Sequence, residues 1–280
     1  MATTTAGVLY LVGTPIGNLA DLSERARDTL AAADVVAAED TRRTGRLLAG
    51  LGLRTPLVSM FEGNEQQRAA ELIGRLERGA RVAVVTDGGM PGVSDPGYRV
   101  VRMAVERGID VRVVPGPSAA VAALVVSGLP TDRFAFEGFL PRRPGHRAAR
   151  LRAVRDDPRT LVVFESPRRT ATLLREVISI LGDRRVAVCR ELTKLHEEVV
   201  RGTAREVLAS LGDRELRGEV VVVVEGASGP AAPPDPDLLR AEVHRLVDEG
   251  MKPRRAARVV AERHGASANE LYRDLLDGDR

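Results

Sequence analysis

The chain has 280 residues, of which 44% are hydrophobic and 29% are charged, a composition typical of globular, soluble proteins. This length is compatible with about two domains, and no apolar run reaches the roughly 20 residues that a membrane-spanning helix needs. The first residues, MATTTAGVLYLVG, lack the basic and apolar regions of a secretory signal peptide. We therefore expect a cytoplasmic protein with no membrane partner.

The counts of cysteine, histidine and charged residues exclude several kinds of site. Cys189 is the only cysteine, which rules out an internal disulfide and a multi-cysteine zinc site. The four histidines contain no His-x-x-x-His pair, so we expect no metal site. The net charge is +3, and every cationic residue except Lys194 and Lys252 is arginine. A GC-rich genome explains that bias more simply than RNA binding does.

The first part of the chain, up to Pro117, alternates short apolar runs with amphipathic stretches. The patterns predict buried strands at 8–12, 35–38, 82–85 and 111–114, and helices at 23–32, 64–77 and 98–107. This alternation of strand and helix favours a parallel sheet covered by helices.

A second unit is expected to begin with a helix at 118–127, for which Ser118 is a suitable N-cap. Strands are predicted near 134–138, 161–164, 186–190 and 220–224, and a further helix starts with Ser166 as cap and Pro167 at its first position. Residues 226–237 have the composition of a linker. Three short helical patterns follow it, at 238–248, 253–263 and 268–276.

Two loops follow predicted strands of the first unit. The loop VGTPIGNL at 12–19 is neither a dinucleotide fingerprint nor a phosphate-binding P-loop, and on its own it is typical of an ordinary turn. The loop TDGGMPGVSDPG at 86–97 holds four glycines, more than one turn requires. Gly88, Gly89 and Gly92 have no Cβ to keep a ligand from the backbone, and ligands bind past the carboxyl ends of parallel strands. We therefore favour a backbone-lined pocket over a plain loop.

Three other segments have both a functional and an ordinary explanation. VVPGPSAA at 113–120 is either a helix start that binds an acceptor group or a linker with a capped helix. VFESPRR at 163–169 and CRELTKLHEE at 189–198 present polar groups after strands; such groups are usually solvated, although Glu191, Lys194 and His196 supply acid–base capacity. His196 alone is more typical of a surface histidine.

An arginine-rich tract, LPRRPGHRAARLRAVRDDPR, occupies residues 140–159. It holds seven arginines against two aspartates, so it is either the solvated face of a helix or a nucleic-acid contact. The sequence alone favours neither.

Taken in order and spacing, these segments resemble the tetrapyrrole methylase superfamily and, within it, the RsmI-type ribosomal RNA ribose methyltransferases. The similarity is carried by GTPIGNLADLS, AAEDTRRTGRLL, DGGMPGVSDPG, VVPGPSA, FEGFLPRR, FESPRR and RELTKLHEE, from about residue 8 to 227. The end of the chain, RRAARVVAERHGASANELYRDLL, is similar to the helical C-terminal region of the same group.

The resemblance implies an α/β fold of two domains, the class III S-adenosylmethionine methyltransferase fold, with a small helical C-terminal region. We expect domains at 8–117 and 118–227, and a helical domain at 235–280. The resemblance also implies S-adenosylmethionine as cofactor and a homodimer. The implied reaction is methylation of the ribose 2′-oxygen of a cytidine in the decoding region of 16S rRNA, within the small ribosomal subunit.

The resemblance also transfers site residues. The cofactor positions of the superfamily map onto Pro15 or Ile16, Asp87, Gly88, Gly89, Met90, Val93, Ser118, Ala119, Phe164, Glu165 and Leu192. Relatives often read Asp-Ala-Gly-Thr-Pro where this chain has Asp87-Gly88-Gly89-Met90-Pro91, so a side-chain bond from that threonine is missing here while backbone contacts are unaffected.

Methyl transfer from a sulfonium needs mainly in-line positioning and a path for the hydroxyl proton. Lys194 and Glu191, and after them His196, are the candidates for a weak base or for holding the ribose. Phosphate contacts are expected from Arg142, Arg143, Arg147, Arg168 and Arg169. A tetrapyrrole-precursor methyltransferase would share the cofactor pocket without needing the arginine tract or the helical tail. A non-catalytic ribosome-assembly factor would not need the pocket, and the missing fingerprint excludes a nicotinamide oxidoreductase.

Overall fold

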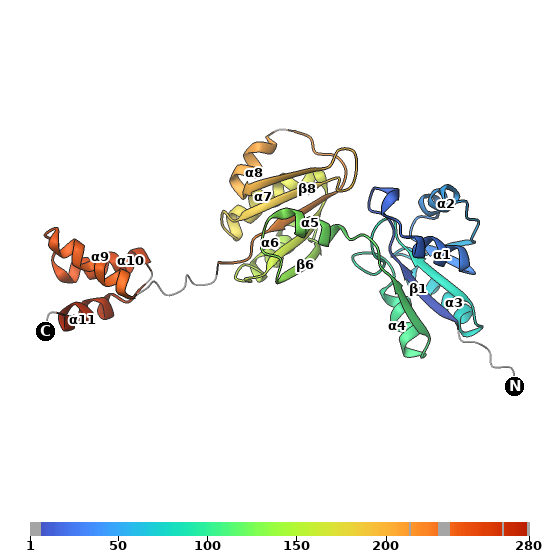
Figure 1. Ribbon diagram of the computed structural model, residues 1–280, viewed down its shortest axis with the longest axis horizontal. Helices are drawn as coiled ribbons and strands as arrows, with labels where there is room; N and C mark the ends of the chain where they lie inside the picture. Colours follow the sequence, from blue (N-terminus) through green and yellow to red (C-terminus); the bar gives the residue numbers. More distant parts are fainter. Residues whose placement is uncertain (1–6, 213, 229–235, 265, 279–280) are drawn as a thin grey trace. The chain divides into compact units, whose positions relative to one another are not determined.

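The computed structural model describes residues 7–212, 214–228, 236–264 and 266–278. Packing divides the chain into two compact units, Met1–Gly226 and Ala227–Arg280. The first unit holds two β-sheets, and the described part of the second is helical (Figure 1). The predicted linker at 226–237 lies largely outside the described residues.

The first sheet is fully parallel, with its strands in the order β3-β2-β4-β1-β5. These strands are β1 (Val8–Val12), β2 (Val35–Ala38), β3 (Leu57–Ser59), β4 (Arg81–Val85) and β5 (Asp110–Val114). Helices α3 (Glu65–Glu77) and α4 (Tyr98–Glu106) pack on one face, and α1 (Glu24–Ala32) and α2 (Thr41–Gly50) pack on the other. A short 3-10 turn, η1 (Leu19–Asp21), precedes α1.

The alternation of side chains along each strand decides which helices it contacts. Val82 and Val84 of β4 face α3 and α4, whereas Ala83 and Val85 face α1 and α2. All four side chains are at most 1% exposed. Burial on both faces is what an apolar run without polar alternation predicts, and each of the three valines contributes about 1.5–3 kcal/mol through removal from water.

The second sheet is mixed, with strands in the order β6-β7-β10-β8-β9. The neighbours β6 and β7 pair in parallel, and the other three neighbouring pairs are antiparallel. Its strands are β6 (Phe134–Phe139), β7 (Thr160–Glu165), β8 (Arg185–Arg190), β9 (Glu198–Thr203) and β10 (Val220–Val224). Helix α5 (Ala119–Ser127) covers one face. Helices α6 (Pro144–Ala153), α7 (Pro167–Ile180) and α8 (Ala204–Leu211) cover the other.

The division predicted between residues 117 and 118 falls in the segment that joins β5 to α5, and therefore between the two sheets. By packing, both sheets nevertheless belong to one compact unit. The loops after their strands therefore form common cavities, which are described below.

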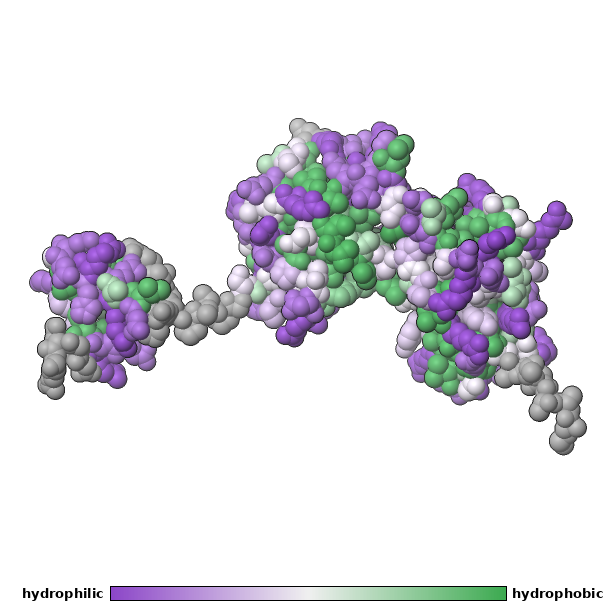
Figure 2. Space-filling model, in the orientation of Figure 1, coloured by the Kyte–Doolittle hydropathy of each residue, from purple (hydrophilic) through white to green (hydrophobic). Residues whose placement is uncertain are grey.

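The C-terminal unit consists, in its described residues, of α9 (Pro236–Asp248), α10 (Pro253–His264) and α11 (Ala268–Gly278). It has its own apolar core, which includes Leu239, Val243, Val260 and Leu271. The face of this unit seen in Figure 2 is mostly hydrophilic. Across the described helices of the whole chain, none has the length and apolar character needed to cross a membrane.

Candidate functional site

The loops after β1, β4 and β5 meet at one end of the first sheet. Thr14 and Gly89 exchange two backbone hydrogen bonds, of 2.9 and 3.0 Å, and form an isolated antiparallel bridge. Gly13 lies against Gly116 so closely that a Cβ on Gly13 would stand 2.6 Å from the Gly116 Cα atom. Gly13 is therefore small because a neighbouring loop packs directly against it. An ordinary turn would not require a glycine for that reason.

The glycine-rich loop adopts backbone conformations that side chains disfavour. Gly89 has φ +94°, in the left-handed region that glycine adopts without strain. Ser94, in the same loop, has φ +61° although it carries a Cβ. In the described chain the other non-glycine residues with positive φ are Glu191 and Thr193, in the loop after β8. Such strained positions concentrate at binding sites, where the fold holds them in place.

The first of two adjoining cavities, the apolar cavity, has a volume of about 460 Å³. The loops after β2 and β4 and the starts of α5, α7 and β10 form its walls. It is lined by Ile16, Glu39, Arg43, Asp87, Gly88, Gly89, Met90, Val93, Asp95, Ser118, Ala119, Phe139, Phe164, Glu165, Ser166, Pro167, Gly218, Glu219, Val220 and Val221. Phe164 packs edge-to-face on Phe136 and Phe139, with ring centroids 4.9 and 5.5 Å away. This wall is an apolar surface for a flat ring.

Glu165 places an unpartnered acceptor in the wall of the apolar cavity. The residue is 2% exposed, and its Oε1 atom accepts from the Ser166 N–H at 2.6 Å and pairs with Arg169 at 2.5 Å. Its Oε2 atom is buried and has no partner among the described residues. A buried carboxylate oxygen without a partner is costly, so the geometry favours a ligand that donates a hydrogen bond there.

Three other acidic residues that line the apolar cavity, Glu39, Asp87 and Asp95, lie close to one another. Burial raises the pKa of Asp95 to about 6, and the nearby charges of Glu39 and Asp87 add to this effect. Burial also raises the pKa of Glu39. Arg43 pairs with Asp87 at 3.2 Å. The described residues contain no group of three His, Cys, Asp or Glu side chains arranged to hold a metal ion.

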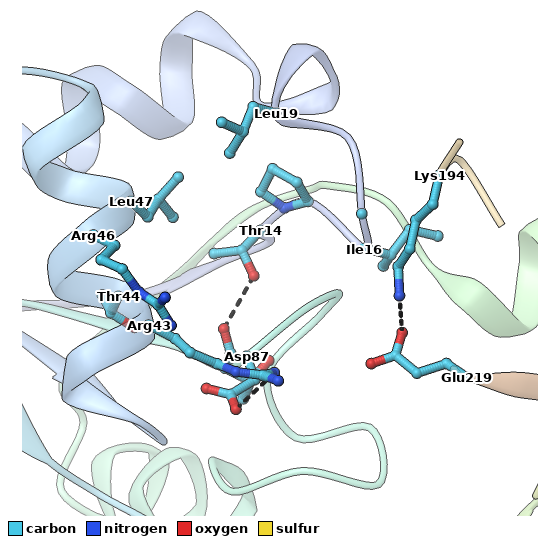
Figure 3. Close-up of a pocket in the computed structure, with 13 residues that line it drawn as sticks. Thr14, Ile16, Leu19, Arg43, Thr44, Arg46, Leu47, Asp87, Lys194 and Glu219 are labelled. Carbon is cyan, nitrogen blue, oxygen red and sulfur yellow. Dashed lines mark hydrogen bonds and ion pairs between the residues drawn. The ribbon is translucent and has the colours of Figure 1, made fainter. Parts of the chain in front are cut away.

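The second cavity, the cationic cavity, has a volume of about 500 Å³. Figure 3 draws the residues that line it. It is lined by Thr14, Pro15, Ile16, Gly17, Leu19, Arg43, Thr44, Arg46, Leu47, Thr86, Asp87, Lys194 and Glu219. Four of these residues, Ile16, Arg43, Asp87 and Glu219, also line the apolar cavity. A ligand in one cavity therefore lies next to a ligand in the other.

Lys194 lines the cationic cavity and is held by two carboxylates, of which Glu219 lines both cavities. Its Nζ atom donates to Glu191 Oε1 at 2.8 Å and to Glu219 Oε2 at 3.0 Å. Burial acts to lower the pKa of Lys194, but the hydrogen bonds to Glu191 and Glu219 outweigh burial and raise it. These hydrogen bonds favour the protonated amine over the neutral base, and the catalytic role of Lys194 stays a prediction. A role in holding the ribose remains a proposal.

The other acid–base candidates differ in position. Burial would raise the pKa of Glu191, but its hydrogen bond with Lys194 and a backbone N–H bond from Glu219 lower it overall, which makes its carboxylate a weak base. His196 is exposed and does not line either cavity. The structure therefore brings Glu191 and Lys194 together and leaves His196 apart.

Most residues expected at the cofactor line the apolar cavity: Asp87, Gly88, Gly89, Met90, Val93, Ser118, Ala119, Phe164 and Glu165. Ser118 is also the N-cap of α5, where its Oγ accepts from the Val121 N–H at 3.5 Å. Pro15 lines the cationic cavity instead. Leu192 is 8% exposed and packs in the core under α5, so it lines neither cavity.

The arginines expected at rRNA phosphates divide into two groups. Arg142, Arg143 and Arg168 are exposed. Arg147, in contrast, is 5% exposed and forms a two-bond ion pair with Glu176, at 2.5 and 2.7 Å. The structure contradicts Arg147 as a phosphate contact, because its guanidinium is committed within the fold. Arg169 is half-buried against Glu165 and lies behind the apolar cavity.

Sequence reasoning missed several lining residues: Glu39, Arg43, Arg46, Asp95, Phe139 and Glu219. Glu39 directly follows the strand at 35–38. The segments at 163–169 and 189–198 were considered as candidate sites because polar residues follow a buried strand there. The same pattern at 35–38 indicates Glu39 and the start of the helix that follows it.

The fold and the paired cavities define a methylase of one family. The model of the Tetrapyrrole (Corrin/Porphyrin) Methylases matches residues 8–208, and the chain belongs to this family. A crystal structure of uroporphyrin-III-C-methyltransferase from Thermus thermophilus aligns with a TM-score of 0.54 at 26% identity, covering 78% of this chain and 94% of that one. A cobalt precorrin-4 methyltransferase aligns with a TM-score of 0.59 at 18% identity and supports the fold alone.

Curated relatives extend over almost the whole chain. A protein of Escherichia coli O157:H7 named ribosomal RNA small subunit methyltransferase I is 42% identical over 279 residues, 99% of this chain and 97% of its own length. A protein of the same name from Mycobacterium tuberculosis (strain CDC 1551 / Oshkosh) is 44% identical over 280 residues, again 99% of this chain and 97% of its own length. These relatives share the C-terminal helices, which lie beyond the family model.

Proposed function

We propose that the protein is an S-adenosylmethionine-dependent methyltransferase that acts on the ribose 2′-hydroxyl of a cytidine in the decoding region of 16S rRNA. The observation that carries this function is the adjoining pair of cavities, one apolar with buried acceptors and one cationic. The full-length similarity to proteins named ribosomal RNA small subunit methyltransferase I supports rRNA as the substrate.

The residues of the apolar cavity fit S-adenosylmethionine. The Phe139 and Phe164 rings offer a surface for adenine, and the orphaned Glu165 Oε2 accepts from an amine or hydroxyl. Glu39, Asp87 and Asp95 supply negative charge where a sulfonium and an ammonium group need it, which is favourable at short range. The absence of Cβ atoms at Gly88 and Gly89 leaves room for contact with the main chain.

When bound, S-adenosylmethionine supplies an electrophilic methyl group, so the chain's own residues have mainly to position the acceptor hydroxyl. The protonated Lys194 donates hydrogen bonds at the junction of the cavities and orients the hydroxyl oxygen. Glu219 lines both cavities. We therefore assign the hydroxyl proton to the Glu219 carboxylate in preference to Glu191, which lines neither cavity.

The cationic cavity is suited to the target nucleotide of an RNA chain. Arg43 and Arg46 project from α2 on one side, and Lys194 reaches in from the other (Figure 3). Arginine forms bidentate contacts with phosphate oxygens. Pro15, Leu19 and Leu47 supply apolar surface for a base. Arg142, Arg143 and Arg168 are proposed to bind phosphates further along the rRNA.

We also propose a homodimer. The edge strand β5 and helix α5 expose valines that an isolated molecule would leave in water: Val113 is 55% exposed, Val121 49% and Val125 63%. Exposed apolar side chains on neighbouring elements favour a protein contact. Analytical ultracentrifugation of a Val121→Glu/Val125→Glu variant is expected to show a monomer where the parent protein is a dimer.

A cytoplasmic location follows from the proposed substrate. We further propose that residues 8–117 and 118–227 act as the two cofactor-binding domains and 235–280 as a helical accessory domain.

The function is tested by incubating the protein with radiolabelled S-adenosylmethionine and small ribosomal subunits from a strain that lacks the enzyme, followed by mapping of the labelled nucleotide. Label on the ribose of one cytidine in the decoding region is expected. Label on a sirohaem or corrin precursor instead of rRNA would establish the tetrapyrrole alternative. Tight rRNA binding without any transfer would leave only an assembly factor.

A further inference from the structure

The C-terminal unit carries a basic groove that the cofactor and nucleotide cavities do not involve. The groove, with a volume of about 640 Å³, lies between α10 and α11 and is defined by Arg254, Arg255, Arg258, Asn269 and Tyr272. The unit has an apolar core of its own, so the groove is formed by helices packed against each other.

Helical spacing separates the two faces of α10. Ala256, Ala257 and Val260 are at most 1% exposed and face the core. Arg254, Arg255 and Arg258 are exposed, and residues at positions i, i+1 and i+4 share one side of a helix. The cationic side chains of α10 therefore project together on the face that the core does not use.

Charge is concentrated on this helix and not spread over the unit. Residues 227–280 contain nine lysines or arginines and ten aspartates or glutamates, so the unit has a net charge of −1. Residues 252–258 nevertheless hold four cationic side chains and no acidic one. A locally positive surface on a unit of slightly negative net charge indicates an anionic partner, because charge that served only solubility would have no reason to collect at one groove.

The side chains beside the arginines point to the class of anion. Tyr272 lies in the groove, and the Arg254 guanidinium is 5.6 Å from the centre of its ring. Arginine contacts phosphate through two parallel hydrogen bonds, an aromatic ring stacks on a base, and an amide such as that of Asn269 bonds base edges. Phosphate, ring and amide recognition together match a nucleic acid better than an acidic protein or a lipid surface.

We propose that this groove is a second RNA-binding site, which holds a single-stranded or splayed segment of the rRNA substrate outside the cavities where transfer occurs. The proposal rests on the proposed function for the identity of the RNA. Because the groove and the cavities belong to one chain, binding at the groove raises the local concentration of the target nucleotide.

The test uses the full-length protein and four variants. Arg254→Ala/Arg255→Ala removes two groove cations, whereas the control Arg245→Ala/Arg273→Ala removes two exposed cations of α9 and α11 that do not line the groove. Tyr272→Phe keeps the ring, and Tyr272→Leu removes it. Fluorescence anisotropy with a labelled single-stranded RNA of about 20 nucleotides measures Kd over a range of salt concentrations. Methyl transfer to small subunits gives KM and kcat.

The groove double variant is expected to weaken RNA binding about tenfold and to reduce the slope of log K against log salt by about 1.4, the value for two lost single-strand phosphate contacts. KM for small subunits rises, while kcat and cofactor affinity stay unchanged. Tyr272→Leu weakens binding without altering the slope, and Tyr272→Phe behaves as the parent.

The proposal would be overturned if the groove variant and the control variant had the same Kd for RNA and the same salt slope. It would also be overturned if the groove variant lost as much affinity for polyglutamate or for anionic vesicles as it loses for RNA. These outcomes are separable from failure of the proposed function, because the latter appears as lack of methyl transfer by the parent protein.

Discussion

The side chain of Lys194 passes directly over Gly17. A Cβ on Gly17 would overlap the Lys194 Cγ atom and stand 2.8 Å from its Cε atom. The loop after β1 thus leaves a space that the only lysine of the first unit fills, and the side chain reaches the carboxylates of Glu191 and Glu219 through that space.

Gly17→Ala is therefore expected to displace the Lys194 ammonium and lower kcat by about a hundredfold, the usual effect of a positioning error near 1 Å. Cofactor affinity, measured by calorimetry, should change little, since Gly17 does not line the apolar cavity. Gly50→Ala is the matched control, because nothing lies within 4 Å of the Cβ that it adds. Equal kcat for both variants would contradict a positioning role for Lys194.

Lys194 itself is expected to act as a charged donor. Lys194→Met, which keeps the apolar stem, should reduce turnover about a hundredfold or more, whereas Lys194→Arg should retain measurable turnover because guanidinium remains a cation and a donor. The rate should not rise in parallel with lysine deprotonation at high pH, since hydrogen bonds to Glu191 and Glu219 raise the pKa of Lys194. A neutral base is indicated instead if turnover in Lys194→Arg is lost and the parent rate rises with lysine deprotonation.

Glu165→Gln is expected to weaken S-adenosylmethionine binding by about tenfold to a hundredfold, since a hydrogen bond to a charged group contributes about 1.5–3 kcal/mol. The amide also weakens the ion pair with Arg169. Glu176→Gln serves as the control: it weakens the buried pair with Arg147, which lies outside the cavity lining. Calorimetry should find reduced affinity in the first variant alone, with reduced thermal stability in both.

Asp95 is expected to make cofactor affinity depend on pH. Its pKa is raised to about 6, so the carboxyl is protonated below that pH, and a cationic ligand favours the ionised form. Affinity should therefore fall by up to about tenfold per pH unit below pH 6. Asp95→Asn should bind the cofactor more weakly at pH 7, and its affinity should no longer depend on pH in this range.

The stability of the free protein should change with pH in the opposite direction. Because the pKa of Asp95 is raised on folding, the contribution of this carboxyl group to stability increases as pH falls from about 6 towards 3.8.

Cys189 is expected to be unreactive while the protein is folded. Its side chain is buried among the residues under α5, and burial raises the pKa of the thiol to about 11. Because the thiolate is the reactive form, iodoacetamide at pH 8 should leave the native protein unmodified and alkylate it fully in denaturant. Mass spectrometry of both samples checks this, and rapid alkylation of the native form would contradict the burial.

The apolar patterns were sufficient to predict the central strands of the first unit, because strands buried on both faces carry continuous runs such as 35–38 and 82–85. Two edge strands were missed. β3 has only three residues, and β9 (EVVRGT) has no fully buried residue, so neither shows a clear apolar run. Helix α2 was missed because its sequence, TRRTGRLLAG, begins with charged residues and has only two buried side chains.

The glycine-rich loop indicated Gly89 directly, whereas Phe164 and Glu165 were expected at the cofactor only through the resemblance to the family. Phe139 and Glu219 were missed, because no local pattern relates them to the loop at 86–97. Ionisation likewise could not be predicted: Lys194 suggested a neutral base until its carboxylate partners were located. The burial of Arg147 could not be predicted either, because nothing within the arginine-rich tract distinguishes Arg147 from Arg143. The difference comes from the ion pair with Glu176, which lies outside the tract.

The apolar cavity takes walls from both sheets, with Gly89 on one side and Glu165 on the other. If either sheet unfolds, the cavity loses one of its walls, and the ligand no longer binds to the sheet that is still folded. Its binding free energy, about 2.7 kcal/mol at a concentration one hundred times Kd, is therefore shared by both halves. Saturation with methyl donor should thus merge their melting into a single, later transition, and the cellular supply of the donor would govern how long the enzyme survives as well as how fast it works.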